Sequence, residues 1–369
     1  MTEEPWDDPA QSPLLLAVDR GDYELVTDGP TPPGPGAGTE GQRALEIARR
    51  WCEAGVEAEL RRRSGTAGPA EHTVVRHDGG WLSHEVSLGG LTVRTGHAAI
   101  LTRLESAYGL AQSFDVLKRR ALAEPDVDHV VWFETTSVLS QRQLRTPANL
   151  DAAWNAAAAL AVSPDPLERY FGADVLHCVD LFDESEDFPF DTPLADLFLP
   201  WAEREEDPRV LRVLTDGLAS SMDPRAVAPL TALTRHPDGR VRELAVQGLP
   251  FPMNSGNKEA VTAVVERTRD DVPAVRRAAC TALGAVPVGY PDVTVAHIPY
   301  GTLRLDALAG CLSDDEEDVR VTAAGWLAMS DDPRADEVLC SYEGIGEDSP
   351  YYGELYSAWR RRERQVAAR

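Results

Sequence analysis

The chain has 369 residues, of which 43% are hydrophobic and 26% are charged, the profile of a folded protein that buries a sizeable core. It carries 36 Lys and Arg residues against 61 Asp and Glu residues, a formal net charge of −25. This excess of carboxylates argues against a general nucleic-acid binder and against an anionic membrane surface as partner, because both require a basic face.

The first residues hold no basic and apolar stretch of the secretory type, so no signal peptide is expected. The longest apolar run, residues 156–162, is far shorter than the ~20 residues that span a bilayer. The cysteines are widely spaced, odd in number and without a CxxC pair; they are Cys52, Cys178, Cys280, Cys311 and Cys340. We therefore expect a cytoplasmic protein with reduced thiols. The preference for arginine over lysine, with abundant Ala, Gly and Pro, is typical of a GC-rich bacterial genome.

Residues 12–26 predict a first pair of short helices, and a looser copy of the same pattern runs over residues 41–60. The Pro/Gly-rich residues 28–38 between them predict a loop. The segment resembles an ankyrin repeat. The matching positions are Ser12-Pro13-Leu14, Ala17 and Gly21, with Leu15 in place of the usual His. The resemblance implies an ankyrin-like helical segment over residues 1–65.

Residues 66–97 break the helical pattern and predict a β-hairpin or a short meander. Residues 72–76 and 82–93 are rich in β-branched side chains, and pairs of glycines at 79–80 and 89–90 separate the extended runs. A helix is expected to begin at Gly96 and to run towards Arg120.

Half of the eight histidines lie in this insert; they are His72, His77, His84 and His97. Imidazole and nearby carboxylates suit zinc or iron, so a metal-binding enzyme centred on residues 72–97 is one alternative. The spacing of the histidines matches no standard metal motif, and alternate hairpin positions face opposite sides. We therefore expect these four histidines to lie on the surface or to pack against neighbouring side chains, with no metal and no cofactor.

Three segments of the C-terminal two thirds share one pattern: an acidic turn, then Val-Arg, then Ala three residues and Leu seven residues after the arginine. Two looser copies extend the series. The anchor arginines of the five copies are Arg169, Arg212, Arg242, Arg276 and Arg320. They lie about 30 to 44 residues apart, enough for one pair of antiparallel helices with loops. The acidic turn suits the N-terminus of the second helix in each pair. The predicted first helices cover residues 150–162, 194–202, 226–234, 260–267 and 303–312.

This pattern resembles HEAT repeats, in the short bacterial form of phycobilin-lyase-like proteins. In that family the turn Asp and the arginine bond between adjacent repeats, which implies a structural ladder for the five anchor arginines. The implied fold is mainly α: an α-solenoid, a right-handed superhelix of antiparallel helix pairs, with a small β-hairpin insert near the N-terminus. The expected divisions are an ankyrin-like segment at 1–65, a hairpin with a linking helix at 66–112, a HEAT-like array at 113–345 and a capping helix at 346–369.

The sequence holds no catalytic signature, since GxSxG and P-loop motifs are missing. A stacked helix array instead offers an extended surface to another macromolecule. We therefore expect a non-enzymatic protein-protein interaction scaffold or adaptor that binds another protein and neither nucleic acid nor membrane. Acidic stretches at 183–191, 203–207 and 314–318 would attract a basic protein. An immunity-type inhibitor of a basic toxin is accordingly the main alternative.

The partner is expected on the second helices, which line the concave side of HEAT-like arrays. The Val, Ala and Leu of the pattern form the core stripe, and positions one and five after each arginine lie away from it. The candidate contact residues are Tyr170, Asp174, Glu243 and Gln247. The same rule selects Val213, Gly217, Arg277, Thr281, Val321 and Gly325.

Overall fold

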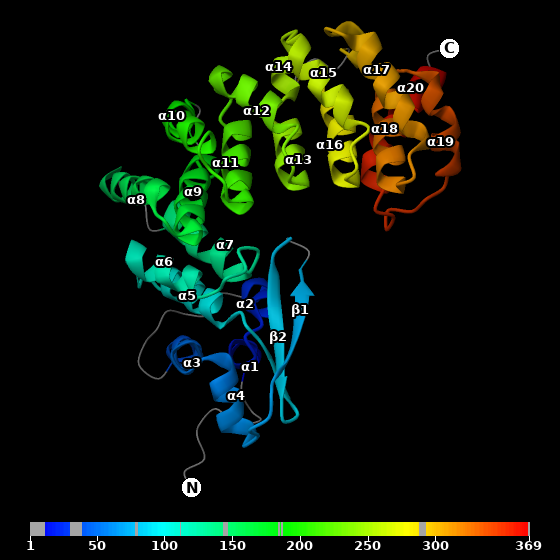
Figure 1. Cartoon of the computed structure of the whole chain (residues 1–369). Helices are drawn as coiled ribbons and strands as arrows, with labels where there is room; N and C mark the ends of the chain where they lie inside the picture. The colour runs from blue at the N-terminus through cyan, green and yellow to red at the C-terminus, as the bar shows by residue number, and fades with distance from the viewer. Residues whose placement is uncertain are drawn as a thin grey trace. The chain divides into compact units, whose positions relative to one another are not determined.

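The computed structural model describes residues 12–29, 39–77, 80–110, 112–142, 147–183, 185, 187–287 and 293–367 (Figure 1). Its contacts divide the chain into two compact units, Met1–Glu184 and Ser185–Arg369. This division falls inside the range 113–345, over which one array was expected. Among the described residues, no helix is long and apolar enough to cross a membrane.

The first unit holds a three-stranded sheet among helices. Its elements are α1 (Pro13–Asp19), α2 (Tyr23–Asp28), α3 (Glu40–Ala54), α4 (Val56–Ser64), β1 (Glu71–Arg76), β2 (Leu82–Leu88), β3 (Leu91–Arg94), α5 (His97–Ala107), α6 (Phe114–Leu122), α7 (Val130–Ser137), the π-helical turn η1 (Val138–Arg142), α8 (Pro147–Ala159), the 3₁₀ turn η2 (Leu160–Val162) and α9 (Pro166–Leu181).

Capping side chains mark the starts of α1 and α3, and a glycine forms the turn between α1 and α2. The hydroxyl of Ser12 accepts the Leu15 N–H ahead of α1, and Thr39 does the same for Gln42 ahead of α3. Between α1 and α2, Gly21 has a φ of 65°, and a Cβ at this position would lie 2.0 Å from the carbonyl oxygen of Arg94. Only glycine fits this turn, because it tolerates both the left-handed backbone and the close approach.

The sheet is an antiparallel meander in the order β1-β2-β3. Gly89 and Gly90, with φ of 60° and 82°, join β2 to β3, as the glycine pair predicted. The turn expected around 79–80 lies partly outside the described residues. One face of β2 is buried through Leu82, Val86 and Leu88, whereas β1 is exposed along nearly its whole length. The small insert of strands near the N-terminus is therefore confirmed.

The single helix expected from Gly96 towards Arg120 is wrong, because two helices occupy this range. The first, α5, ends at Ala107, and Gly109 then adopts a left-handed φ of 70°. Ser113 caps the second helix, α6, by accepting the Val116 N–H. A left-handed glycine followed by a capping serine ends one helix and starts another despite the apolar periodicity.

The second unit consists of helices in pairs. Its elements are α10 (Asp191–Ala202), α11 (Pro208–Ser220), η3 (Pro224–Ala226), α12 (Val227–Leu233), α13 (Gly239–Gln247), α14 (Pro250–Asn254), α15 (Lys258–Arg267), α16 (Pro273–Gly284), η4 (Val295–His297), α17 (Gly301–Gly310), η5 (Cys311–Ser313), α18 (Glu317–Met329), η6 (Pro333–Ala335), α19 (Asp336–Ser341) and α20 (Tyr352–Ala367).

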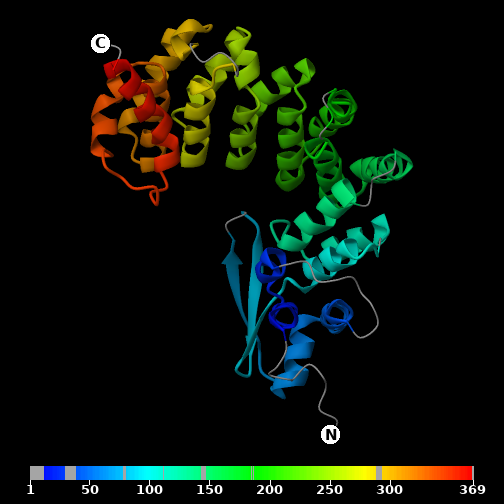
Figure 2. The same cartoon turned by 180° about the vertical axis from the view of Figure 1, so that it is seen from behind.

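The pairs stack so that equivalent helices lie side by side. Helices α11, α13, α16 and α18 contact one another in that order, and both views show them as one row (Figures 1 and 2). The partners that precede them, α10, α12, α15 and α17, form a second layer. The predicted first helices coincide with these elements and, in the first unit, with α8 and η2. The predicted α-solenoid of helix pairs is thus confirmed.

The core of the second unit is the predicted stripe. The Val before the anchor arginine, the Ala three residues after it and the Leu seven residues after it are fully buried in the three clearest copies. They are Val241, Ala245 and Leu249, Val275, Ala279 and Leu283, and Val319, Ala323 and Leu327. Small residues also let helices approach closely: a Cβ at Gly284 of α16 would lie 2.1 Å from the Trp326 ring of α18.

Candidate functional site

Three anchor arginines reach the acidic turn inside the following helix pair, ahead of the second helix of that pair. In each case the guanidinium donates to both oxygens of one carboxylate, with N–O distances between 2.6 and 3.1 Å. The pairs are Arg212–Asp238, Arg242–Asp270 and Arg276–Asp314. The guanidinium of Arg212 holds the pKa of Asp238 below its usual range, and Arg276 does the same for Asp314. Bidentate geometry of this kind fixes the spacing between neighbouring pairs of helices.

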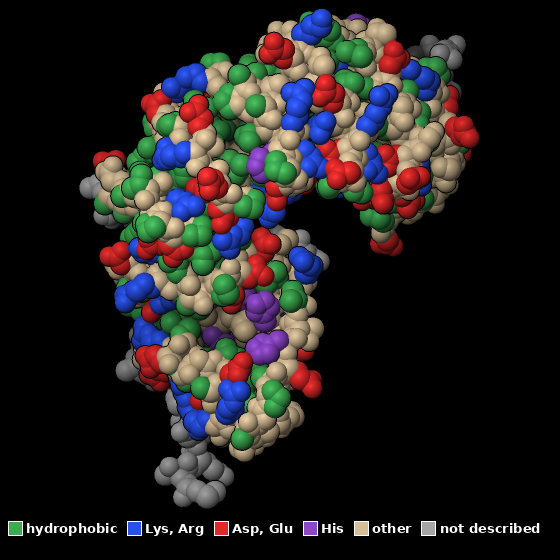
Figure 3. Space-filling view, viewed as in Figure 1, with side chains coloured by type: hydrophobic (Ala, Val, Ile, Leu, Met, Phe, Trp, Pro, Cys, Tyr) green, Lys and Arg blue, Asp and Glu red, His purple; other side chains and the backbone are tan. Residues whose placement is uncertain are grey.

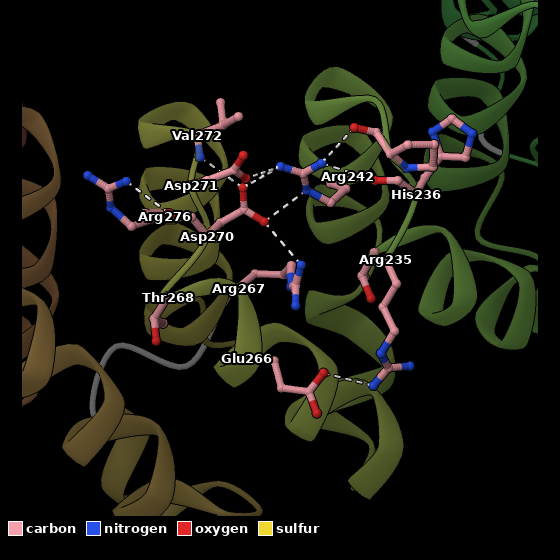
Figure 4. A network of polar contacts seen from close by, with 12 residues as sticks. Arg235, His236, Arg242, Glu266, Arg267, Thr268, Asp270, Asp271, Val272 and Arg276 are labelled. Carbon is pink, nitrogen blue, oxygen red and sulfur yellow. Dashed lines mark hydrogen bonds and ion pairs between the residues drawn. The ribbon is translucent and has the colours of Figure 1, made fainter.

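Arg242 is the least exposed of these three arginines, and Figure 4 shows its contacts. It donates to Asp270 and also to Asp271 at 2.6 Å, and its Nη1 donates to the carbonyl oxygens of His236 and Pro237 at 3.0 Å. Burial raises the pKa of Asp270, but the hydrogen bonds from Arg242 and the Val272 N–H outweigh it, so this pKa lies below its usual range.

The other two anchor arginines donate to the backbone of the turns before their own helices. Arg169 donates to the carbonyl oxygens of Ser163 and Pro164, and Arg320 to those of Asp314 and Asp315. Arg242 makes the same backbone contacts in its own turn. The backbone contacts thus recur in the clear copies and in the looser copy of Arg169, whereas the three bidentate pairs link consecutive pairs within the second unit.

Two of the candidate contact residues lie in one hollow on the row of second helices. Glu243 and Gln247 of α13 line a hollow of about 300 Å³ together with Arg277 and Thr281 of α16. Ala274 and Ala278 are further parts of its wall, and Glu316 and Asp318 line the side towards α18. Glu243 also pairs with Arg240 at 2.8 Å. Three carboxylates and one guanidinium make this an acidic hollow.

A larger hollow of about 830 Å³ adjoins the first, because Gln247 lines both. Its lining is mainly apolar, and Met222 and Phe251 at its border are each 63% exposed. Asp223 supplies its charge, and that carboxylate pairs with Arg225 at 2.7 Å. The acidic hollow and this apolar hollow therefore form one continuous surface around Gln247.

The remaining candidate positions do not join this surface. Tyr170 and Asp174 lie half-buried on α9 in the first unit, where the Tyr170 ring meets the Trp132 ring edge-on at 5.2 Å. Four positions placed on the surface by the spacing rule are buried; they are Val213, Gly217, Val321 and Gly325. That expectation was wrong because the second helices also pack sideways against one another.

The four histidines of the insert have separate partners. His72 contacts Glu57 at 3.0 Å, His77 contacts Glu24 at 2.6 Å and stacks on Trp81. His97 stacks on the Trp51 ring, and the ring of His84 lies 5.7 Å from that of His129. Histidine side chains gather around β2 (Figure 3), yet no group of three or more His, Cys, Asp or Glu residues within the described ranges could hold a metal ion.

A second set of Arg–Asp contacts, on the layer of first helices, escaped the sequence analysis. Arg225 donates to Asp196 of α10, and Arg334 donates to Asp306 of α17, each at 2.7 Å. Both arginines also donate to the two carboxylate oxygens of the Asp two residues before them. The signal was the repeated Asp-Pro-Arg-Ala at 223–226 and 332–335, which marks a turn capped by its own aspartate.

Comparisons with known proteins bear on the fold. Curated proteins include no match to the sequence. Among solved structures, YibA of Escherichia coli is 17% identical with a TM-score of 0.47, covering 69% of this chain and 84% of its own. A designed armadillo repeat protein is 14% identical with a TM-score of 0.37, covering 59% of this chain and 99% of its own. An engineered protein is 18% identical with a TM-score of 0.46, covering 95% of this chain and 90% of its own.

The family comparison falls on the part of the chain drawn in Figure 4. Residues 232–296 match the family model of HEAT repeats. This span contains α13, α15 and α16 and the Arg242–Asp270 pair. The chain is therefore similar to HEAT-repeat proteins where its repeat pattern is clearest.

Proposed function

We propose that the chain is a non-enzymatic, cytoplasmic scaffold that binds a protein partner on the second helices of its second unit. The observation that carries the proposal is the continuous surface around Gln247, with an acidic hollow on one side and an apolar hollow on the other. Protein interfaces combine an apolar centre with a polar rim in this way. A similarity to HEAT repeats over 232–296 agrees with a binding role.

The partner fitted by this surface carries a basic side chain next to apolar ones. Glu243, Glu316 and Asp318 face the acidic hollow against the one guanidinium of Arg277. Met222 and Phe251 offer apolar contact at the other end. Three of the five anchor arginines, Arg212, Arg242 and Arg276, belong to the proposal as the ladder that holds the helices of the second unit at fixed spacing, so that the hollow keeps its shape. Arg169 and Arg320 instead brace the turns before their own helices.

The test is the paired substitution Glu243→Ala with Gln247→Ala. A partner is first identified by affinity capture on the full chain, and its dissociation constant is then measured by calorimetry with purified proteins. The double variant is expected to weaken binding at least tenfold and to shift the free energy of unfolding by less than about 1 kcal/mol, as surface substitutions do.

The matched control is Glu259→Ala with Thr262→Ala, two exposed residues on α15 in the other layer. This control should leave affinity unchanged. Equal affinity of both double variants for the partner would contradict the proposed surface. A partner with nuclease activity that is blocked in the complex would assign the chain to the inhibitor class, on the same surface.

A further inference from the structure

The sheet of the first unit has one free edge among its described strands. The outer side of β3 is covered at its C-terminal end, because the Arg94 N–H donates to the Arg20 carbonyl at 2.7 Å and the Gly96 N–H donates to that of Gly21. The outer side of β1 pairs with none of the described residues. Backbone groups on this side face solvent over a six-residue strand.

The register identifies the backbone groups that point outward. His84 exchanges hydrogen bonds with Thr95, and the Leu82 N–H donates to Asp128, so both residues direct their backbone away from β1. In an antiparallel pair, their partners Val74 and Arg76 then direct their own N–H and C=O groups away from β2. By the same alternation, the backbone N–H and C=O groups of His72 also point away from β2.

The middle of this edge lacks the devices that usually block strand pairing, because the charged side chains of β1, Glu71 and Arg76, stand at its two ends. Natural edges carry proline, a bulge, lysine or an inward charge, whereas β1 keeps a regular register of six pairs and contains the β-branched run Thr73, Val74 and Val75. Val74 is 55% exposed, although its cross-strand neighbour His84 lies on the same face as buried Leu82 and Val86. The strand thus extends the buried face of β2 into solvent.

We propose that β1 binds an extended segment of another protein, which adds a fourth strand to the sheet. The segment pairs its backbone with His72, Val74 and Arg76 and sets a β-branched or aromatic side chain against Val74. A second copy of this chain does not fit as well, because a six-residue edge is far smaller than the ~20–30 residues a side of a standard interface. An extended segment of another protein needs only the backbone groups of this six-residue edge and no larger interface.

The test uses a phage-displayed library of random linear nine-residue peptides, selected on the full chain alone and then measured for binding to the wild type and to Val74→Pro. Proline at this position removes an N–H that faces solvent, so the variant should keep its circular dichroism and melting temperature. Thr73→Pro removes a hydrogen bond to β2 instead and should disrupt the hairpin. Enriched peptides are expected to bind the wild type at least tenfold more tightly than Val74→Pro.

Hydrogen exchange on the wild-type chain tests the proposal without any variant. The amides of His72, Val74 and Arg76 should exchange quickly in the free chain and become protected when a selected peptide is added. Peptides that bind Val74→Pro equally well, or that protect amides elsewhere, would overturn the proposal. A wild-type dimer in sedimentation experiments that Val74→Pro dissolves would also overturn it, since the occupant would then be a second copy.

Discussion

Arg242 and Asp270 belong to successive helix pairs, yet they are only 7% and 6% exposed. Removing one member of a buried pair costs about 3–5 kcal/mol where the other charge keeps no partner. Asp270 also accepts from Arg267 at 3.1 Å, which places the loss of Arg242 at the lower end of this range. We expect Arg242→Ala to lower the free energy of unfolding of the second unit by about 3 kcal/mol, measured by urea titration with circular dichroism. The double variant Arg242→Ala/Asp270→Ala should lose less than the sum of the single variants.

The control for this prediction lies beside the pair in Figure 4. Arg235 and Glu266 also join neighbouring helix pairs, at 2.8 Å, but their side chains are 54% and 45% exposed. Exposed pairs contribute less than about 1 kcal/mol, so Arg235→Ala should change stability little. If Arg242→Ala lowers the free energy of unfolding no more than Arg235→Ala does, the ladder has no structural role.

Two buried histidines make the first unit sensitive to acid. Burial lowers the pKa of His97 from 6.5 to about 4, and burial together with the nearby His84 lowers that of His129 to about 4. Both folded-state values lie below the unfolded value, so the unfolded chain binds protons first. Stability from these groups is complete above pH 6.5 and is lost as the pH falls towards 4, by about 1.4 kcal/mol per pH unit for each histidine.

Replacing one histidine isolates its share of this slope. His129 accepts the Val131 N–H on Nδ1 and contacts Thr95 through Nε2, which holds it neutral. His129→Gln should be less stable than the wild type at pH 7.5 but show a shallower decline in its urea midpoint between pH 6.5 and 4.5. An unchanged slope would mean that His129 does not titrate as its burial implies.

Individual contacts could be predicted from the sequence only where they recur. Arg242 and Arg276 were identified because the same arginine follows several acidic turns. Arg304 occurs once and is fully buried, where it donates to the carbonyl oxygens of Leu283 and Ala285 and to the side chain of Asn254. The sequence around Arg304 resembles that around an exposed arginine on a helix, so no pattern predicts that this side chain is buried.

At the scale of elements, the helical period located the helices better than it located their faces. It placed Glu243 and Gln247 off the core, where they lie. The reason is that the apolar stripe of each helix faces the other helix of the same pair. It failed at Val213 and Val321 because a solenoid helix also packs against the helices on either side. The sideways contacts depend on stacking, which the sequence of one repeat does not contain.

A close sideways contact joins α16 and α18 at Gly284. Gly284→Ala would place a methyl group 2.1–2.6 Å from Trp326, so the two helices must separate or the indole must move. Overpacking of this kind costs about 1–3 kcal/mol, measurable as a lower melting temperature. Gly310→Ala on α17 is the control: its Cβ meets nothing within 4 Å, and it should be neutral or stabilising because alanine favours helix. Equal effects of the two variants would argue against a close approach at Gly284.

At the scale of the molecule, the stacked helices need a cover at the α18 end of the second unit. The last helix, α20, packs on α18 through Leu355 and Ala358, which are fully buried, and Arg361 donates to both oxygens of Asp331. Solenoids rely on such covers to keep the face of the outermost repeat out of water.

Removing residues 346–369 should therefore expose the apolar face of α18. We expect the shortened chain to self-associate in size-exclusion chromatography with light scattering and to melt at a lower temperature. A chain shortened only by residues 363–369 keeps Leu355, Ala358 and Arg361 and should remain like the full chain. A monomeric, equally stable 1–345 chain would show that α20 does not act as a cover.

The Arg–Asp pairs also bear on how such a chain can grow. The helix pairs α12/α13 and α15/α16 each carry an aspartate that receives an arginine from the pair before it and an arginine that reaches the pair after it, as Asp270 and Arg276 illustrate. A gene segment that encodes one helix pair therefore contains both halves of the joint. Duplicating that segment in tandem would create a new joint with no unmatched charge, so the ladder favours lengthening of the array by whole repeats and disfavours insertions of any other length.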